Sequence, residues 1–421
     1  MNHYSLRLGI NIIGLLCILA CCLSTSAKEL EFAKPEDVGL SSKALRDIES
    51  VVGSHLDQGH LAGAVTMVLR KGKIAHLEAH GWQDFEARIP MRENTIFKIY
   101  SMTKAIVSTG VMMLVEEGRF DLDDPIGKYI AELAHLKVYK AGKNEDARRA
   151  VTIRDLLRHT AGMTYGFFGD SPVDALYLAA GILNSADDSS EFVRKLGNLP
   201  LIHHPGDGWN YSVAVDVQGV LIERVAKVSL DRFLKERIFE PLNMPDTGFH
   251  VPLEKRGRFA STYDNSSGQG LKVADQASRS DFRFPPRFFS GGGGLVSTAH
   301  DYSHFVQMLL NEGELFGTRI LSAETVTEMT RNQLPAKTYP IGIGEPRPGV
   351  GFGLGFSIRV EPSNWDPEGK VGEYGWGGAA STHFWISPKD KLAVITLEQT
   401  RPYNWNLEFG LKGLIYEAIV D

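Results

Sequence analysis

Residues 97–104 read Phe-Lys-Ile-Tyr-Ser-Met-Thr-Lys, a stretch that places a serine three positions before a lysine. A serine hydroxyl is a weak nucleophile until a neighbouring base takes its proton. The apolar periodicity of residues 105–117 predicts a helix. If Ser101 opens this helix, Lys104 lies one turn further on the same face and its amine can reach the serine oxygen. Because first-turn amides lack intrahelical partners, the Ser101 N–H can also donate to an oxyanion.

A surface pair without chemistry is the plain alternative to a catalytic serine and lysine. Chance alone gives a chain of this length about one or two serine-to-lysine spacings of this kind. The spacing occurs only once in this chain, however. No Gly-x-Ser-x-Gly elbow is present, which removes the usual α/β-hydrolase signature, while a Ser-His-Asp triad stays open.

Two further patterns are similar to a metal site and to a phosphate-binding loop, but each lacks residues that such a site needs. His300 and His304 are four residues apart on one predicted helix face, but no glutamate follows His300 in the zinc-protease manner and no third ligand is evident. We therefore expect a solvated or locally hydrogen-bonded pair and no metal site. The glycines at 291–294 lack the lysine and hydroxyl of a phosphate loop, so we expect a turn before a helix capped by Ser297 or Thr298.

Taken in order, several segments make the chain resemble the serine β-lactamase-like superfamily. This superfamily includes class C β-lactamases, D-alanyl peptidases and the family VIII carboxylesterases, which are the most similar group. The resemblance covers almost all of residues 28–421. Its carriers are residues 97–104, 156–162 (Leu-Leu-Arg-His-Thr-Ala-Gly), 209–213 (Trp-Asn-Tyr-Ser-Val), 291–298 (Gly-Gly-Gly-Gly-Leu-Val-Ser-Thr) and 375–378 (Gly-Trp-Gly-Gly).

The resemblance assigns roles to three side chains. It implies that Ser101 is the acylated nucleophile, that Lys104 is the lysine of the family's first motif, and that Tyr211 is the tyrosine of the second. Without the motifs around it, Tyr211 would be read as a core aromatic. Lysine and tyrosine ordinarily titrate near pH 10, so one of the two needs a shifted pKa to act as the base. The sequence leaves open which one.

The resemblance also implies a strand beside the nucleophile, formed here by Trp376, Gly377, Gly378 and Ala379. The Ala379 N–H would then be the second oxyanion donor, and the glycines would let the backbone approach closely. A glycine bulge in an ordinary strand is the alternative.

Two departures from the lactamase pattern bear on the substrate. Trp376 stands where penicillin-recognising relatives have Lys or His, and Val213 where many have Asn, so two polar handles are missing. We expect a carboxylesterase, or transesterase, that acts through an acyl-enzyme on small neutral esters. The alternatives are β-lactam or D-amino-acid peptide cleavage on the same machinery, and a catalytically silent envelope binding protein. Arg287, in a loop, is the residue that would restore a binding group for a substrate carboxylate. The aromatic runs 165–168 and 284–289 either form the wall of an acyl pocket or belong to the core.

The remaining patterns fit an α+β fold of the β-lactamase/transpeptidase type, with an antiparallel sheet built from N- and C-terminal strands and flanked by helices. Strands are predicted at 64–70, 73–79, 353–360, 374–386 and 392–398, and helices at 105–117, 153–158, 216–228, 230–239 and 404–420. We expect a sheet domain of residues 28–110 and 288–421. A mainly helical domain of residues 111–287 would be inserted in it, with long loops at 252–286.

The segment 1–27 has the features of a secretory signal peptide, with an apolar core followed by small residues up to Ala27. The core is shorter than a membrane-spanning helix needs, so a permanent anchor is the weaker interpretation. All three cysteines lie in this leader. Cys21 ends a segment similar to a lipoprotein cleavage box, so lipidation there is an alternative. We expect an exported protein, periplasmic or secreted, whose mature chain has no transmembrane segment.

The composition limits the classes of binding partner that we expect. The net charge is −6, the pI is near 6.1 and no Lys/Arg-rich stretch is present, which argues against nucleic acid. We expect a small ester or amide as the partner and no cofactor. The oligomeric state has no signature in the sequence.

Overall fold

The computed structural model describes residues 29–421. The predicted leader with Cys21 therefore lies outside the described residues. No helix in residues 29–421 is long and apolar enough to cross a membrane.

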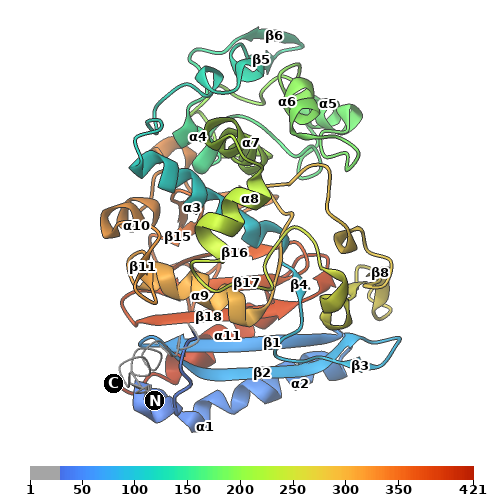
Figure 1. Ribbon diagram of the computed structural model, residues 1–421, viewed down its shortest axis with the longest axis vertical. Coiled ribbons are helices and arrows are strands. Elements are labelled where there is room, and N and C mark those ends of the chain that lie inside the picture. Colours follow the sequence, from blue (N-terminus) through green and yellow to red (C-terminus); the bar gives the residue numbers. More distant parts are fainter. Residues whose placement is uncertain (1–28) are drawn as a thin grey trace, which may run out of the picture.

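A large antiparallel sheet forms the lower half of the molecule in Figure 1. Strands from both ends of the chain build it, and β18 and β1, which come from opposite ends of the sequence, pair directly within it. The sheet that the sequence predicted is thus confirmed. In spatial order its strands are β14 (Val350–Phe352), β15 (Ser357–Arg359), β16 (Tyr374–Gly378), β17 (Thr382–Ser387), β18 (Leu392–Glu398), β1 (Gly63–Arg70), β2 (Lys73–Asp84) and β3 (Ile89–Pro90).

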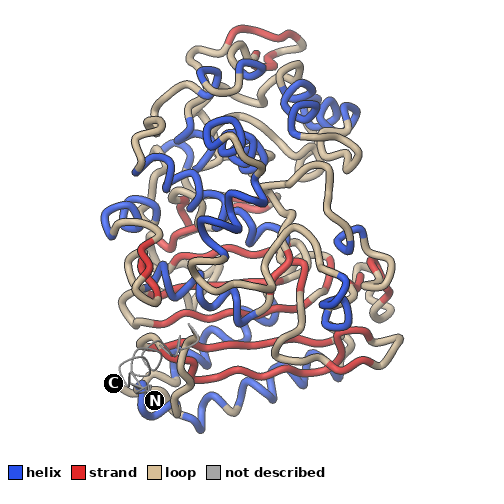
Figure 2. Tube along the Cα trace, viewed as in Figure 1, coloured by secondary structure: helices blue, strands red, loops and turns tan. Residues whose placement is uncertain are grey.

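Both faces of the sheet are covered, which explains why β1 is apolar along almost its whole length. Ala64 and Val68 face a cluster formed with α1 (Ser42–Leu45), α2 (Asp47–Asp57) and α11 (Asn406–Glu417). The alternate residues of β1 face the main core, which includes buried residues of α3 (Thr103–Glu116) and α9 (Ala299–Leu310). Figure 2 shows α1 and α2 running along the lower edge of the sheet, beside β2.

The upper part of Figure 1 is mainly helical. It contains α4 (Ile153–Leu157), α5 (Pro172–Ala180), α6 (Ser189–Leu196), α7 (Ala214–Ala226) and α8 (Leu230–Leu234), while α10 (Ala323–Met329) lies at its side. Helix α3 runs through position 110, the limit that the sequence suggested between two domains. That division stays a prediction.

Three expectations about strands and loops were wrong in detail. Of the single strand expected at 353–360, only β15 is strand, and it pairs with β14, which ends before residue 353. The single strand expected at 374–386 is the hairpin of β16 and β17. Residues 252–286 are not only loop, because β7 (Thr262–Asp264) pairs with β8 (Lys272–Asp275) and with β19 (Thr400–Arg401). Strands this short do not show a readable alternation. The remaining short pairs are β4 (Phe97–Lys98) with β9 (Val296–Ser297), β5 (Lys137–Lys140) with β6 (Lys143–Asp146), β10 (Glu314–Leu315) with β11 (Thr318–Arg319), and β12 (Gly342–Ile343) with β13 (Glu345–Pro346).

Candidate active site

Ser101 lies in a tight turn between a strand and a helix. Strand β4 ends at Lys98, a 3₁₀ turn covers Tyr100–Met102, and α3 follows directly. Tyr100 has a φ of +40°, in the left-handed region that a bulky residue rarely adopts. The Arg401 guanidinium lies over the Tyr100 ring, 4.8 Å from its centroid. The strained residue turns the chain sharply, so that Ser101 precedes α3 by two positions rather than opening it.

Lys104 contacts Ser101 as the spacing predicted. Its Nζ lies 3.1 Å from Ser101 Oγ and 2.6 Å from the carbonyl oxygen of Gly292, and the residue is buried. The amine also lies 4.6 Å from the centroid of the Tyr211 ring. The expected contact between this serine and this lysine is present, but the carbonyl that also contacts the lysine was missed.

Asp216 on α7 is a second residue that sequence reasoning missed. Its carboxylate accepts hydrogen bonds from Ser290 Oγ at 2.6 Å and from the Gly292 N–H at 3.0 Å. Burial raises the pKa of Asp216, and the charge of Lys104 opposes that rise. Asp216 therefore anchors the glycine turn whose carbonyl receives Lys104. The turn expected at 291–294 is present and holds the lysine.

The glycine turn offers a matched pair of substitutions. A Cβ on Gly292 would lie 2.6 Å from Tyr165 Oη and closer still to Asp216, whereas a Cβ on Gly293 would meet Tyr100 atoms only at 3.6 Å or more. Gly292→Ala is expected to push the turn away from Lys104 and to lower kcat about tenfold or more, since small misplacements in a site are costly. Gly293→Ala should leave kcat near that of wild type. Equal kcat values for the two variants, measured on one ester, would contradict the role of the Gly292 carbonyl.

Tyr211 is placed against the nucleophile helix by Trp376. The Trp376 indole N–H donates to Tyr211 Oη at 3.2 Å, and the two ring centroids are 5.3 Å apart. His159 packs on the Tyr211 ring and lies 3.3 Å, Nδ1 to Oγ, from Ser212. Burial lowers the pKa of His159 well below its usual value. Trp376 is thus a hydrogen-bond partner of Tyr211.

Strand β16 passes close to the nucleophile turn. A Cβ on Gly378 would clash with the carbonyl oxygen of Ile99, so the backbone approach requires glycine here. Thr382 at the start of β17 donates to the same carbonyl oxygen at 3.4 Å. Gly377 is likewise approached closely, by Tyr403. Ala379 follows β16 in the turn and is exposed.

Only one of the two aromatic runs borders Tyr211. Tyr165 and Phe168 lie 5.5 and 5.6 Å from the Tyr211 ring, and Phe167 packs on both. Phe167 and Phe168 are about half exposed. In the run 284–289, by contrast, Phe288 stacks on Phe192 and belongs to the helical part.

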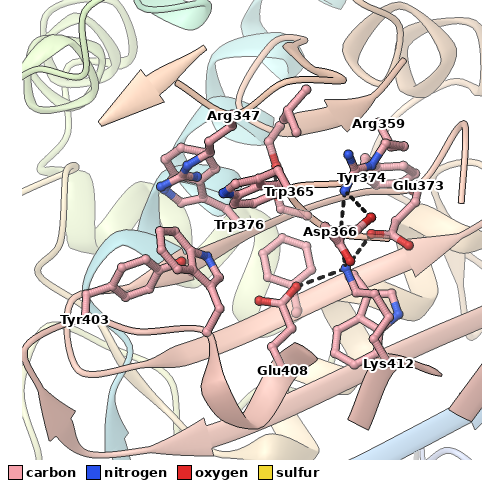
Figure 3. A pocket seen from close by; sticks show the side chains of 17 residues that line it. Arg347, Arg359, Trp365, Asp366, Glu373, Tyr374, Trp376, Tyr403, Glu408 and Lys412 are labelled. Atoms are coloured by element: carbon pink, nitrogen blue, oxygen red, sulfur yellow. Dashed lines mark hydrogen bonds and ion pairs between the residues drawn. The ribbon is translucent and has the colours of Figure 1, made fainter. Parts of the chain in front are cut away.

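A small cavity of about 50 Å³ adjoins Trp376 (Figure 3). Arg347 lies in it, with its guanidinium 5.4, 5.5 and 4.8 Å from the ring centroids of Trp365, Trp376 and Trp405. Arg347 is buried and has no ion-pair partner among residues 29–421. Arg287, the arginine that the sequence singled out, is exposed. Sequence reasoning missed Arg347 because a single arginine in a loop carries no pattern.

Known proteins match most of this chain in sequence or in fold. The model of the beta-lactamase family matches residues 48–410. Protein Rv1367c of Mycobacterium tuberculosis is 37% identical over 357 residues, covering 82% of this chain and 88% of that protein. Esterase EstB of Burkholderia gladioli is 30% identical over 372 residues, covering 84% and 90%. The solved structure of EstCE1, a hydrolase with promiscuous acyltransferase activity, superposes with a TM-score of 0.76 at 23% identity and covers 89% of this chain and 98% of that one.

The family match spans most of the chain, and the serine and lysine expected from the resemblance lie in contact at the start of a buried helix. The resemblance that the sequence suggested is confirmed at the level of family and fold. The chain belongs to the beta-lactamase family, as a serine hydrolase of that fold.

Proposed function

We propose that the protein is an exported carboxylesterase that cleaves small neutral esters through an acyl-enzyme on Ser101. The observation that carries the proposal is the 3.1 Å contact between Lys104 Nζ and Ser101 Oγ beside the Gly292 carbonyl. Family membership supports the serine chemistry, and the name of Esterase EstB favours esters over lactams as substrates.

The first step is acylation of Ser101. We assign Lys104 Nζ to receive the hydroxyl proton while Oγ bonds to the ester carbonyl carbon, and negative charge develops on the carbonyl oxygen. The N–H groups of Ser101 and Ala379 are the proposed donors to that oxyanion. In other hydrolases the loss of one such donor costs roughly 3 to 4 kcal/mol of transition-state stabilisation.

Collapse of the oxyanion then breaks the bond between the acyl carbon and the alcohol oxygen. Tyr211 Oη, which accepts from the Trp376 indole N–H, keeps its own proton available for the departing alkoxide. Lys104 can then pass the proton that it took from Ser101 to Tyr211, which replaces the proton that Tyr211 gave to the alkoxide. Water then attacks the acyl-enzyme by the reverse proton transfers and releases the acid. An alcohol in place of water gives transesterification, an acyl transfer of the kind that the name of EstCE1 describes for that protein.

The proposal that the protein is exported rests on the signal-peptide features of residues 1–27. Cleavage after Ala27 gives a periplasmic or secreted form that begins at Lys28, whereas lipidation at Cys21 gives an anchored form with the same catalytic chain. N-terminal sequencing of the exported product distinguishes Lys28 from a blocked, detergent-partitioning product that starts at Cys21.

One substrate panel tests the proposed activity. Purified mature protein is assayed with p-nitrophenyl acyl esters, a chromogenic cephalosporin and D-alanyl peptides. Turnover of the esters with the highest kcat/KM supports the proposal. Higher kcat/KM on the cephalosporin or the peptides would establish the amide alternative, and turnover of none of them would favour the silent binding protein.

We predict that a carboxylate on the acyl chain lowers kcat/KM about ten- to a hundredfold. Relatives that recognise penicillins have Lys or His at the position of Trp376, and a hydrogen bond to a charged group is worth about 1.5 to 3 kcal/mol. Arg347 is shielded by three tryptophan rings and is not expected to replace that anchor. The measurement compares matched esters with and without a terminal carboxylate.

The same comparison in Arg347→Met and Arg287→Ala shows which arginine matters. We expect the preference for the neutral ester in all three proteins. A wild-type preference for the carboxylate ester that disappears in either variant would contradict the neutral-ester assignment and identify that arginine as the anchor.

A further inference from the structure

A cluster of two histidines and a glutamate lies outside the candidate active site. His300 and His304 are one turn apart on α9, with ring centroids 4.8 Å from one another. Glu29 reaches them from the start of the described chain, with its Oε2 2.7 Å from His300 Nε2 and 3.7 Å from His304 Nε2. In residues 29–421 this is the one group of three such side chains whose ligand atoms all lie within 4.8 Å of one another.

The orientation of His304 is fixed by the backbone. Its Nδ1 lies 2.8 Å from the carbonyl oxygen of Leu242 and 3.0 Å from that of Asn243. Carbonyl oxygens only accept, so Nδ1 carries the hydrogen and donates it. Nε2 then presents its lone pair toward Glu29. That nitrogen is fully buried and has no hydrogen-bond partner in the described chain, which is unfavourable for a polar group.

We propose that Glu29, His300 and His304 bind one divalent transition-metal ion of the zinc class. Zinc takes imidazole nitrogen at about 2.0–2.1 Å and carboxylate oxygen at about 2.0–2.2 Å, so two ligand atoms on a tetrahedral ion are about 3.3 Å apart. The separations of Glu29 Oε2 from the two histidine nitrogens, 2.7 and 3.7 Å, bracket this value, and all three ligand atoms lie within 4.8 Å of one another. Glu29 and His300 are partly exposed and can make the small adjustment by side-chain rotation.

The surroundings have the form that metal ligands usually have. A ligating histidine normally donates its other ring N–H to a carbonyl or carboxylate, as His304 does here. The carboxylate is oriented as well, because Asn243 Nδ2 donates to Glu29 Oε1 at 3.0 Å. Three protein ligands leave a fourth position for water. Two nitrogen donors favour zinc or a related ion over Mg²⁺ or Ca²⁺, which prefer oxygen.

The ion would fasten the start of the mature chain to α9. Tyr302 of the same helix donates to the carbonyl oxygen of Met102, in the turn that holds the nucleophile, at 3.0 Å. A bound ion would therefore stabilise the helix on which that turn rests, because a ligand that binds only the folded state adds to its stability. Cleavage after Ala27 and lipidation at Cys21 both leave Glu29 in the mature protein.

The test is metal binding to the purified mature protein after treatment with EDTA. Zn²⁺ is titrated calorimetrically into wild type, Glu29→Gln and His300→Ala, and Co²⁺ absorption in the visible reports the ligand geometry. His60→Ala is the matched control, because His55 and His60 also lie close, Nδ1 to Nδ1 at 3.2 Å, but are outside the cluster. Each protein is also heated with and without Zn²⁺.

We expect one Zn²⁺ per wild-type chain, a higher Tm with the ion, and at least tenfold weaker binding in Glu29→Gln and His300→Ala. His60→Ala should bind as wild type does, and Mg²⁺ should give no response. The proposal is overturned if wild type binds no Zn²⁺, if the two cluster variants bind it as wild type does, or if His60→Ala alone loses it. If Glu29 and His300 form only an ion pair and bind no metal, both variants would have a lower Tm than wild type, by the same amount with and without Zn²⁺. That result would also overturn the proposal.

Discussion

Replacing Ser101 with alanine is expected to lower kcat on p-nitrophenyl esters by at least about 10⁴-fold and to remove the mass increase given by a fluorophosphonate probe. Without Oγ no acyl-enzyme forms, and what is left is binding and oxyanion stabilisation, which alone give modest catalysis. The measurement combines steady-state rates with intact-protein mass spectrometry. Circular dichroism of the variant checks that the fold is kept.

Ser212 supplies the control for this substitution. Its hydroxyl lies 3.3 Å from His159 Nδ1, so it is the serine that a histidine-based mechanism would use in this part of the molecule. Ser212→Ala should keep the probe adduct and most of the activity. An unchanged adduct in Ser101→Ala, or its loss in Ser212→Ala, would move the nucleophile away from Ser101.

Lys104→Met and Tyr211→Phe are expected to lower kcat/KM about 10²- to 10⁴-fold each, the range in which positioned acids and bases contribute. Lys104 is the side chain in contact with Ser101 Oγ, and Tyr211 is held by Trp376 beside it. Methionine keeps the buried stem of the lysine and phenylalanine keeps the ring, so the Tm should change little. Rates are measured on one ester for both variants and for the double variant.

Because the two groups handle one proton, their losses should not add. The double variant is expected to be little slower than the slower single variant, as in other catalytic units. Near-native rates in either single variant would refute the role of that residue. Loss confined to Tyr211→Phe would make Tyr211, and not Lys104, the base that activates Ser101.

Much of the site could be predicted because its parts are local in the sequence. Ser101 and Lys104 are three positions apart, so a helix period was enough to bring them together. Tyr211 and the strand at Trp376 came only from the resemblance, since nothing in their spacing places them beside α3. Asp216 and Arg347 could not be found, because each is a single charged residue whose role depends on burial in the folded state.

The fold was predictable for similar reasons. The long strand β1 and the periodic helices α3 and α7 have strong patterns, and the structure has them within two residues of their expected limits. The hairpin β14 and β15 and the strands within 252–286 are set by tertiary pairing and have no such pattern. The same holds for Glu29, which meets His300 from a distant part of the sequence. No third ligand was visible near the histidines because it comes from the start of the described chain.

Direct observation of the covalent intermediate tests the assignment of Ser101 without relying on a variant. Wild-type protein is mixed with a p-nitrophenyl ester, quenched in acid within the first turnovers and analysed by intact-protein and peptide mass spectrometry. We expect a burst of p-nitrophenol and one acyl group per chain, located on the peptide that contains Ser101. An acyl group on another residue, with none on the peptide that contains Ser101, would contradict acylation of Ser101.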